Sequence, residues 1–380
     1  MRTSAESVLP AIQPVDLAAE REFLGPALEE AVLRVLRSGR YVLGPEVEAL
    51  ERDFAALHGV EHGVALATGT DALWLGLLAV GVQPGDEVVT SPFTFFASAA
   101  SVALIGARPV LADVDYDTAL LDPAKAEAAC SSRTSCLLPV HLYGQLADMR
   151  AFRALADRRR LRILEDGAQA HGARRDGYAC GALGDAGTFS FYVTKNLGAA
   201  GEGGLVLTRS AEVARELRLL RDHGSPTKYV HARLGTNSRL HALQAAILNV
   251  KLPHLEPWNE RRRAIAARYD AAFRSSRAVA PLAREKGGTH TFHQYTVRIR
   301  GGRQRAEVQA TLAGQGIHCG VHYPTPVHLQ EAARPWGYGA GDFPAAERLA
   351  NEVLCLPIHP FLSDSDVDRV AEATLRAADA

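Results

Sequence analysis

Residues 187–204 of this chain read GTFSFYVTKNLGAAGEGG. An apolar, strand-like run ends just before Lys195, and a glycine-rich loop follows that lysine. A lysine amine held where a strand runs out into such a loop is partly desolvated, which favours its uncharged, nucleophilic form near neutral pH. Schiff-base chemistry needs an amine of this kind. On position alone a surface lysine in a flexible loop is the more ordinary interpretation, so the rest of the chain has to decide.

Apolar runs and helix-like segments alternate on either side of this stretch. Helical spacing of Val47, Leu50, Phe54 and Leu57 predicts a helix over 45–58. Further helices are expected over 70–80, 95–105 and 147–158. Seven runs are predicted to be strands, namely 62–67, 87–90, 109–112, 136–140, 162–164, 188–191 and 204–208. This alternation predicts an α/β fold with a mostly parallel sheet covered by helices on both faces.

The pattern changes near residue 251. A long arginine-rich helix, a strand over 292–299, another helix and the segment 316–326 follow, which predicts a smaller α+β region. At 380 residues the chain is long enough for two cores. We therefore expect a large domain over 13–250 and a small C-terminal domain over 251–380. Residues 1–12 are expected to be loose.

Composition argues against several classes of partner. The formal net charge is −1, and the arginine triplets at 158–160 and 261–263 lie in helical stretches, which indicates solvated faces rather than a nucleic-acid site. The most apolar stretch, 73–82, is far shorter than the roughly 18 residues of a membrane span, and the N-terminus lacks the apolar core of a signal peptide. The five cysteines show no metal-ligand spacing and are typical of reduced thiols. We expect a cytoplasmic protein that binds neither nucleic acid nor membranes.

A candidate phosphate site follows the first predicted strand. Residues 68–72, TGTDA, stand directly before a helix. Backbone N–H groups at a helix N-terminus, with hydroxyls beside them, suit an anion such as phosphate. Thr70 can equally be an ordinary N-cap, which is the more frequent role when the motif is taken alone.

Two further motifs stand at predicted strand ends, where α/β folds place their sites. Residues 164–172, LEDGAQAHG, offer Asp166 to a protonated ring nitrogen, while Glu165 should face the other side of the sheet because side chains alternate. Helix capping by Asp166 is the alternative. Residues 92–96, PFTFF, supply an aromatic ring that can stack on a flat cofactor, although core packing is the commoner role.

The phosphate site, the carboxylate and the lysine together fit pyridoxal 5′-phosphate, whose parts need all three. Two other motifs fail in detail. Residues 113–117 begin like a calcium loop, but Thr118 and Ala124 occupy the required glycine and glutamate positions. Residues 198–204 are glycine-rich but follow a lysine and do not match a dinucleotide fingerprint. We therefore expect pyridoxal phosphate, and neither a metal nor NAD.

At these residues the chain closely resembles the DegT-type nucleotide-sugar aminotransferases, which have the aspartate-aminotransferase fold (fold type I). The resemblance runs from about 44 to 362. Its motifs are TGTDA at 68–72, PGDEV at 84–88, PVHLYG at 139–144, EDGAQAHG at 165–172, SFYVTKNLG at 190–198 and NSRL at 237–240. The chain departs from many relatives at Val193, Glu202 and His241, and none of these departures removes a catalytic group.

The resemblance implies a role for each matching residue. Lys195 would form the Schiff base with the cofactor, and Asp166 would pair with the pyridine nitrogen. Gln169 would lie against the ring near its phenolic oxygen, and Phe95 would stack on the ring. Gly69, Thr70, Asp71 and Ser190 would contact the phosphate, the first three largely through their backbone.

The resemblance also implies a homodimer with shared active sites, because Asn237 would reach the phosphate of the neighbouring subunit's cofactor. Dehydratases of the family carry histidine in place of Lys195, so the lysine favours a transaminase. The chain looks most like members that move an amino group from L-glutamate to C3 of a TDP-linked 3-keto-6-deoxyhexose. Residues expected to contact that sugar nucleotide are Lys228, Tyr229, His231, His322, Tyr323 and His328.

Three alternatives remain at this point. The proline-rich segment around His322 can be simply an ordered loop. The enzyme can be a C4 nucleotide-sugar or an aminocyclitol aminotransferase, with the same machinery and a different pocket. Less favoured is a non-catalytic regulatory protein that binds pyridoxal phosphate.

Overall fold

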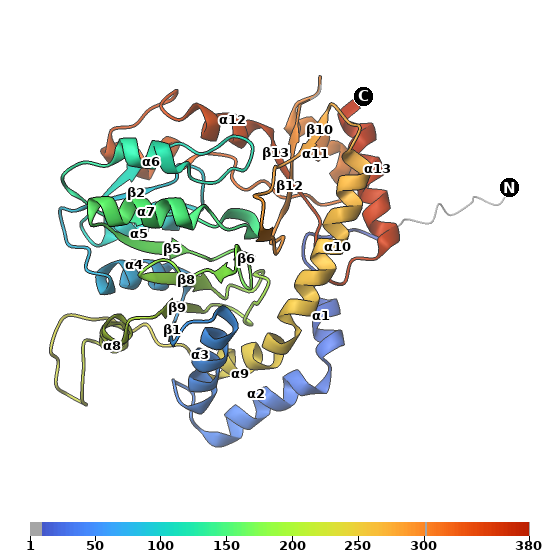
Figure 1. Ribbon diagram of the computed structural model, residues 1–380. Helices are drawn as coiled ribbons and strands as arrows, with labels where there is room; N and C mark the ends of the chain where they lie inside the picture. Colours follow the sequence, from blue (N-terminus) through green and yellow to red (C-terminus); the bar gives the residue numbers. More distant parts are fainter. Residues whose placement is uncertain (1–9, 301, 380) are drawn as a thin grey trace.

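The computed structural model describes residues 10–300 and 302–379. Its larger part is built on a seven-stranded sheet of order β1-β9-β8-β5-β4-β2-β3 (Figure 1). The strands are β1 (His62–Leu66), β2 (Glu87–Thr90), β3 (Arg108–Leu111), β4 (Thr134–Leu138), β5 (Arg162–Asp166), β8 (Ala186–Ser190) and β9 (Gly204–Thr208). The pairs β2–β3, β2–β4, β4–β5 and β5–β8 are parallel, whereas β9 runs antiparallel to β8 and β1. The expected α/β fold with a mostly parallel sheet is confirmed, and each predicted strand is present to within two residues at either end.

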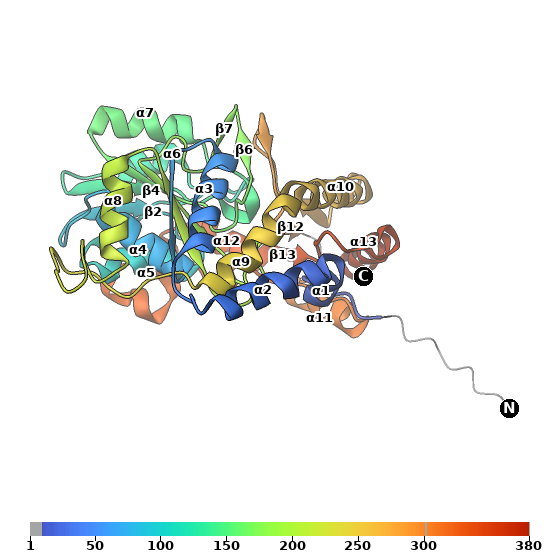
Figure 2. The same cartoon turned by 90° about the horizontal axis from the view of Figure 1, so that it is seen from below.

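Helices cover both faces of this sheet (Figure 2). One face packs on α3 (Pro45–His58), α6 (Pro123–Ala129), α7 (Met149–Arg159) and α9 (Ala242–Lys251). The other packs on α4 (Gly69–Ala79), α5 (Phe96–Leu104) and α8 (Ala211–Leu220). Alternate strand residues serve the two cores: Leu137 of β4 joins the first, and Cys136 and Leu138 join the second. Burial on both faces explains why these strands are continuous apolar runs in the sequence.

The C-terminal part has its own antiparallel sheet and core. The sheet order is β10 (Val279–Pro281), β12 (Tyr295–Ile299), β13 (Val353–Leu356). Helices around it are α10 (Leu255–Phe273), α11 (Arg305–Gly314), α12 (Pro344–Glu352) and α13 (Asp364–Asp379). The predicted strand over 292–299 is confirmed as β12, shortened at its start. We propose a division of the chain near residue 251, where α9 passes through η2 (Leu252–His254) into α10.

The expectation of a loose N-terminal segment is wrong for its last residues. Residues 1–9 lie outside the described part, but Ile12 is 4 % exposed and belongs to the C-terminal core. Its backbone N–H donates to the Gly316 carbonyl at 2.8 Å. Apolar burial beside a backbone bridge to Ile317 fixes this segment.

The remaining elements are short or peripheral. The N-terminal helices α1 (Leu17–Leu24) and α2 (Pro26–Ser38) run beside α9 and α10 (Figures 1 and 2). A small sheet joins β11 (Gly288–Thr289), β6 (Arg174–Arg175) and β7 (Tyr178–Ala179). Short 3₁₀ helices are η1 (Leu142–Gly144), η3 (Val327–Leu329) and η4 (Glu331–Trp336). Among the described residues no helix combines the length and the apolar character needed to cross a membrane.

Candidate active site

A cavity of about 410 Å³ lies where β1, β2, β4, β5 and β8 end. Parallel strands present their carboxyl ends at one edge of the sheet, which is where α/β folds bind ligands. The C-terminal part closes the cavity with four side chains: His293, Gln294, His322 and Tyr323. The sequence-predicted residues that line it are Gly69, Thr70, Phe95, Asp166, Gln169, Ser190, Lys195, His322 and Tyr323.

Lys195 occupies the position expected from its motif, one turn beyond the end of β8. Its backbone N–H donates to the Tyr192 carbonyl at 2.8 Å, which closes that turn. Burial lowers the pKa of the Lys195 amine from 10.5 to about 8, against the opposing effect of the Asp166 and Glu202 carboxylates. The uncharged amine is therefore far more abundant near neutral pH than for a surface lysine.

Asp166 ends β5 with its carboxylate in the cavity. Its Oδ2 accepts a hydrogen bond from the Ser98 hydroxyl at 2.8 Å, and its Oδ1 accepts one from the Ala168 N–H at 3.1 Å. Ser98 is in turn 2.9 Å from the Thr94 hydroxyl. No helix follows Asp166, because residues 167–173 form turns and irregular backbone, so the helix-cap alternative does not apply.

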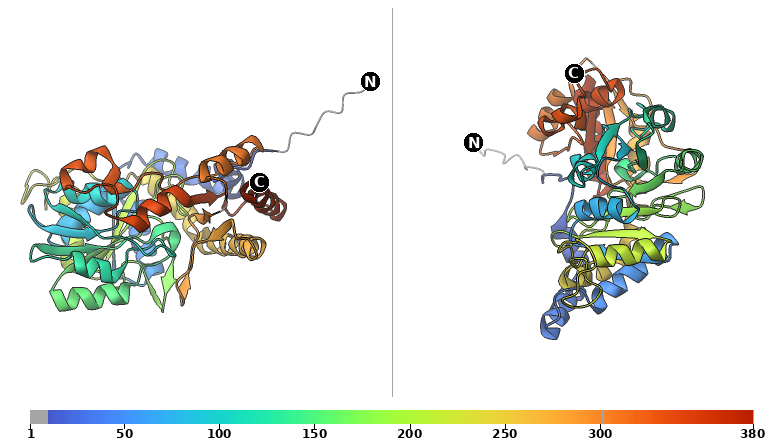
Figure 3. Two further views of the ribbon diagram at one scale, coloured as in Figure 1. Left: turned by 90° about the horizontal axis from the view of Figure 1, so that it is seen from above. Right: turned by 90° about the vertical axis from the view of Figure 1, so that its left-hand side faces the viewer.

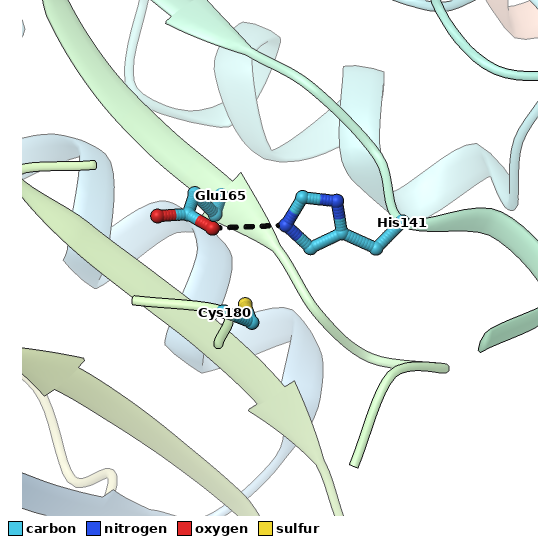
Figure 4. Close-up of side chains that lie close together, drawn as sticks. All are labelled: His141, Glu165 and Cys180. Carbon is cyan, nitrogen blue, oxygen red and sulfur yellow. Dashed lines mark hydrogen bonds and ion pairs between the residues drawn. The ribbon is translucent and has the colours of Figure 1, made fainter. Parts of the chain in front are cut away.

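Glu165 does not line the cavity, as alternation along β5 predicts, and its carboxylate points toward His141 (Figure 4). Its Oε2 lies 2.9 Å from His141 Nε2, and its Oε1 accepts from the Gly184 N–H at 2.6 Å. His141 Nδ1 accepts from the Ala147 N–H at 3.1 Å, so Nε2 carries the hydrogen and donates to Glu165. Burial and the neighbouring carboxylates raise the pKa of the Cys180 thiol well above 9.0, which keeps it protonated. The three side chains are close enough to hold a metal. However, hydrogen bonds within the protein already engage both Glu165 oxygens and both His141 nitrogens.

The phosphate side of the cavity depends on a close backbone approach. A Cβ on Gly69 would lie 2.5 Å from the Ser190 Cβ, so only glycine lets the first turn of α4 meet Ser190. The N-cap of α4 is Thr68, whose Oγ1 accepts from the Asp71 N–H at 3.0 Å. Because Thr68 provides the cap, the Thr70 side chain is not needed for capping and lines the cavity. The implied backbone contact from Asp71 is not supported, because that N–H is engaged in the cap.

Phe95 and Gln169 both line the cavity. Phe95 is 58 % exposed, whereas Phe93 of the same motif is buried, so Phe93 takes the core-packing role and Phe95 faces the cavity. Gln169 accepts from the Tyr143 N–H at 2.6 Å and donates to the Tyr323 hydroxyl at 3.2 Å. Both side chains are placed to contact a flat ring.

Four predicted residues lie outside this cavity, on the segment between α8 and α9 that extends from the body (Figures 1 and 3). All four side chains are exposed: Lys228, Tyr229, His231 and Asn237. Lys228 Nζ lies 5.0 Å from the centre of the Tyr229 ring, and Asn237 Oδ1 accepts from Arg239 Nε at 3.0 Å. Within one chain they contribute nothing to the cavity.

The prediction for His328 is wrong for this structure. Its side chain is fully buried, and Nε2 lies 3.0 Å from Glu347 Oε1. Its ring packs edge-on against Phe343 at 4.8 Å between centroids. His328 stabilises the packing of α12, and the proline-rich segment presents His322 and Tyr323 to the cavity instead.

Sequence reasoning missed Ser98, Tyr143 and His293. Ser98 follows Thr94 by four residues at the start of a helix, so a polar pair on one helix face was a usable signal. Tyr143 lies inside the quoted motif at 139–144, but nothing local assigns it a partner. His293 lines the cavity, and burial with the nearby Lys195 charge holds its pKa well below 6.5.

The residues fit pyridoxal 5′-phosphate: a glycine-dependent helix N-terminus beside Ser190 suits its phosphate, and Asp166 and Lys195 suit its ring nitrogen and its aldehyde. The fold and this site define a pyridoxal-phosphate-dependent aminotransferase of fold type I.

The chain belongs to the DegT/DnrJ/EryC1/StrS aminotransferase family, whose model matches residues 24–375. It is 44 % identical over 370 residues to dTDP-3-amino-3,4,6-trideoxy-alpha-D-glucose transaminase from Streptomyces venezuelae, covering 97 % of both chains. It is 46 % identical over 362 residues to the pleiotropic regulatory protein of Geobacillus stearothermophilus, covering 94 % of this chain and 96 % of that one. The crystal structure of S. venezuelae DesV with a ketimine intermediate superimposes with a TM-score of 0.95 at 44 % identity, covering 98 % and 99 % of the two chains.

Proposed function

We propose that this protein transfers an amino group from L-glutamate to C3 of a TDP-linked 3-keto-6-deoxyhexose, in the biosynthesis of an amino-deoxysugar. The observation that carries the proposal is one cavity shared by Lys195, Asp166 and the His322–Tyr323 pair. Three relatives named as transaminases of dTDP-3-amino sugars support the position of the amino group. Their identities to this chain are 44 %, 43 % and 42 %, and each match covers 90 % or more of it.

The binding roles follow from the cavity. When bound, pyridoxal phosphate supplies an electron sink and a carrier for the amino group. Gly69, Thr70 and Ser190 would hold its phosphate, and Asp166 would hold its ring nitrogen. The Ser98 hydroxyl orients the Asp166 carboxylate through the 2.8 Å hydrogen bond. Phe95 would cover one face of the ring.

Lys195 is the proton carrier in this proposal. With a pKa of about 8, about one tenth of the amine is uncharged at pH 7, and that fraction can accept a proton from the substrate carbon. The ammonium formed at Nζ would then return that proton to C4′ of the bound cofactor, which lies two atoms from the substrate carbon. The surrounding apolar lining, including Leu73, Val140 and Leu142, excludes water from the step.

We extend the proposal to a homodimer acting in the cytoplasm. Tyr229 is 84 % exposed and Leu234 is 95 % exposed on the segment between α8 and α9, which is unfavourable for apolar side chains unless a partner covers them. In a twofold dimer this segment would carry Asn237, Lys228, Tyr229 and His231 to the partner's cavity. All five cysteines are free thiols, which supports a reducing compartment.

The dimer can be tested by mixing two inactive variants, Lys195→Ala and Asn237→Ala. If each site uses Lys195 from one chain and Asn237 from the other, a mixed dimer has one intact site. Random reassortment should then restore about a quarter of the wild-type activity. A mixture as inactive as its components, although exchanged subunits are detected by mass spectrometry, would refute shared sites.

The reaction itself is tested by absorption spectroscopy and then by substrate choice. Adding L-glutamate to the protein with pyridoxal phosphate should replace the band of the lysine-bound cofactor with that of the amino form. A TDP-3-keto-6-deoxyhexose should restore the first band. Restoration by the 4-keto sugar alone would make the C3 assignment wrong, and a spectrum that no amino acid changes would favour a regulatory role.

A further inference from the structure

Three side chains, those of Tyr143, Gln169 and Tyr323, and the His322–Tyr323 peptide link form a closed ring of contacts between the sheet and the C-terminal part. The Tyr143 N–H donates to Gln169 Oε1 at 2.6 Å, and Gln169 Nε2 donates to the Tyr323 hydroxyl at 3.2 Å. The Tyr143 hydroxyl donates to the carbonyl of His322, the residue before Tyr323. Tyr143 and His322 are 179 residues apart in the sequence.

The ring has only one consistent polarity. A backbone N–H can only donate, so Gln169 must present Oε1 to Tyr143 and its amide nitrogen to Tyr323. The Tyr323 oxygen therefore accepts, and its own hydrogen is directed elsewhere. Among residues 10–300 and 302–379 no group accepts that hydrogen, and Tyr323 lines the cavity. Burial raises the pKa of the Tyr323 phenol, so it remains a donor at neutral pH.

Tyr143 makes this arrangement possible through an unusual backbone. Its φ of +61° lies in the left-handed region, which residues other than glycine seldom adopt. That conformation aims its N–H at Gln169 while its buried phenol reaches His322. Burial raises the pKa of this phenol as well, so its hydroxyl is a permanent donor. Backbone strain of this kind persists where surrounding contacts hold it, often at functional sites.

We propose that Tyr143 is a positioning residue: it locks the His322–Tyr323 pair to Gln169, so that the Tyr323 hydroxyl donates to an oxygen of the sugar acceptor. One residue, through its backbone N–H and its phenol, thus fixes the cofactor-facing amide and the sugar-facing phenol relative to each other. The inference rests on the proposed sugar aminotransferase function only for the identity of the acceptor. The locking itself is a property of this chain.

The test removes one oxygen atom. Tyr143→Phe deletes the bond to the His322 carbonyl and keeps the backbone bond to Gln169. The matched control is Tyr269→Phe, which deletes another buried tyrosine bond to a carbonyl, that of Pro357 at 2.9 Å, in the C-terminal core. Backbone hydrogen exchange in segment 320–323 should rise in Tyr143→Phe and stay unchanged in the control. Equal exchange in both variants would overturn the locking role.

The second readout is the Kd of the TDP-linked 3-amino sugar, measured by calorimetry, together with KM for the keto sugar. Both constants should rise about three- to tenfold in Tyr143→Phe, and more than KM for L-glutamate does. Tyr323→Phe should raise them as well, and the double variant should be no worse than Tyr323→Phe alone because Tyr143 acts through Tyr323. Additive effects would overturn the proposal. Failure of the wild-type protein to bind any TDP-sugar would refute the proposed acceptor, while hydrogen exchange would still decide the locking.

Discussion

Gly69→Ala should weaken cofactor binding without unfolding the protein. The new Cβ would lie 2.5 Å from Ser190 Cβ, 2.8 Å from its Oγ and 3.0 Å from its Cα. Ordinary van der Waals contact begins at 3.4 Å. The Ser190 atoms belong to the end of a buried strand, so moving them would disrupt its packing. The first turn of α4 must therefore shift away from Ser190.

The cost of that shift should appear in the affinity for pyridoxal phosphate, because Gly69, Thr70 and Ser190 would no longer converge on one phosphate. Overpacking of this kind costs about 1–3 kcal/mol, which corresponds to a rise in Kd of about five- to 150-fold. The assay is titration of cofactor-free protein, followed by absorbance. Gly314→Ala is the control, since nothing lies within 4 Å of its new Cβ. A Kd for Gly69→Ala equal to that of the control would refute the close-approach argument.

Four further outcomes are expected. In cofactor-free protein, labelling of Lys195 by an amine reagent should become half-maximal near pH 8 and fall at lower pH as the amine protonates, as followed by peptide mass spectrometry; an inflection near 10.5 would contradict the burial argument. Lys195→Ala should abolish turnover while leaving the melting temperature nearly unchanged, and normal turnover would disprove its role. Asp166→Asn should cut the glutamate half-reaction severely, because a neutral amide cannot hold the ring proton; stopped-flow spectra that match wild type would rule this out. Ser98→Ala should slow the same half-reaction about three- to tenfold through loss of one hydrogen bond to Asp166, whereas an unchanged rate would mean that Ser98 does not orient that carboxylate.

The sequence predicts what is local and misses what is remote. Strand β9 was predicted to the residue because an apolar run follows a glycine and ends at Thr208. Lys195 and Asp166 were found because each stands where an apolar run ends. By contrast, Ser98 reaches Asp166 across 68 residues, and Tyr143 reaches His322 across 179. Periodicity carries no information about which strand ends become neighbours, so such contacts need the fold.

The alternative cap role of Thr70 and the assignment of His328 to the sugar both failed for specific reasons. A threonine at either end of a Thr-Gly-Thr motif can cap the helix, and only the backbone decides: Thr68 is extended at φ −146° and ψ 163° and takes the cap, which leaves Thr70 in the helix. His328 was assigned to the sugar because the segment that contains His322 and His328 resembles that of C3 aminotransferases. The 3₁₀ turn η3 carries it back into the protein, where its Nε2 lies against the Glu347 carboxylate rather than a ligand.

Adjacent carboxylates at the end of β5 show how one strand supports two different chemistries. Charges at Glu165 and Asp166 would be costly if both faced one buried space. The strand alternation separates them: Glu165 receives the Gly184 N–H and His141 on the core side, so protein donors engage both its oxygens. Asp166 receives Ser98 and Ala168 but still borders the cavity. Glu165 therefore serves the packing of the strand, whereas Asp166, although buried, lines the cavity where a ligand nitrogen would lie. Exchanging the two residues would put a longer side chain in the cavity and a shorter one opposite His141, so both functions should be lost together.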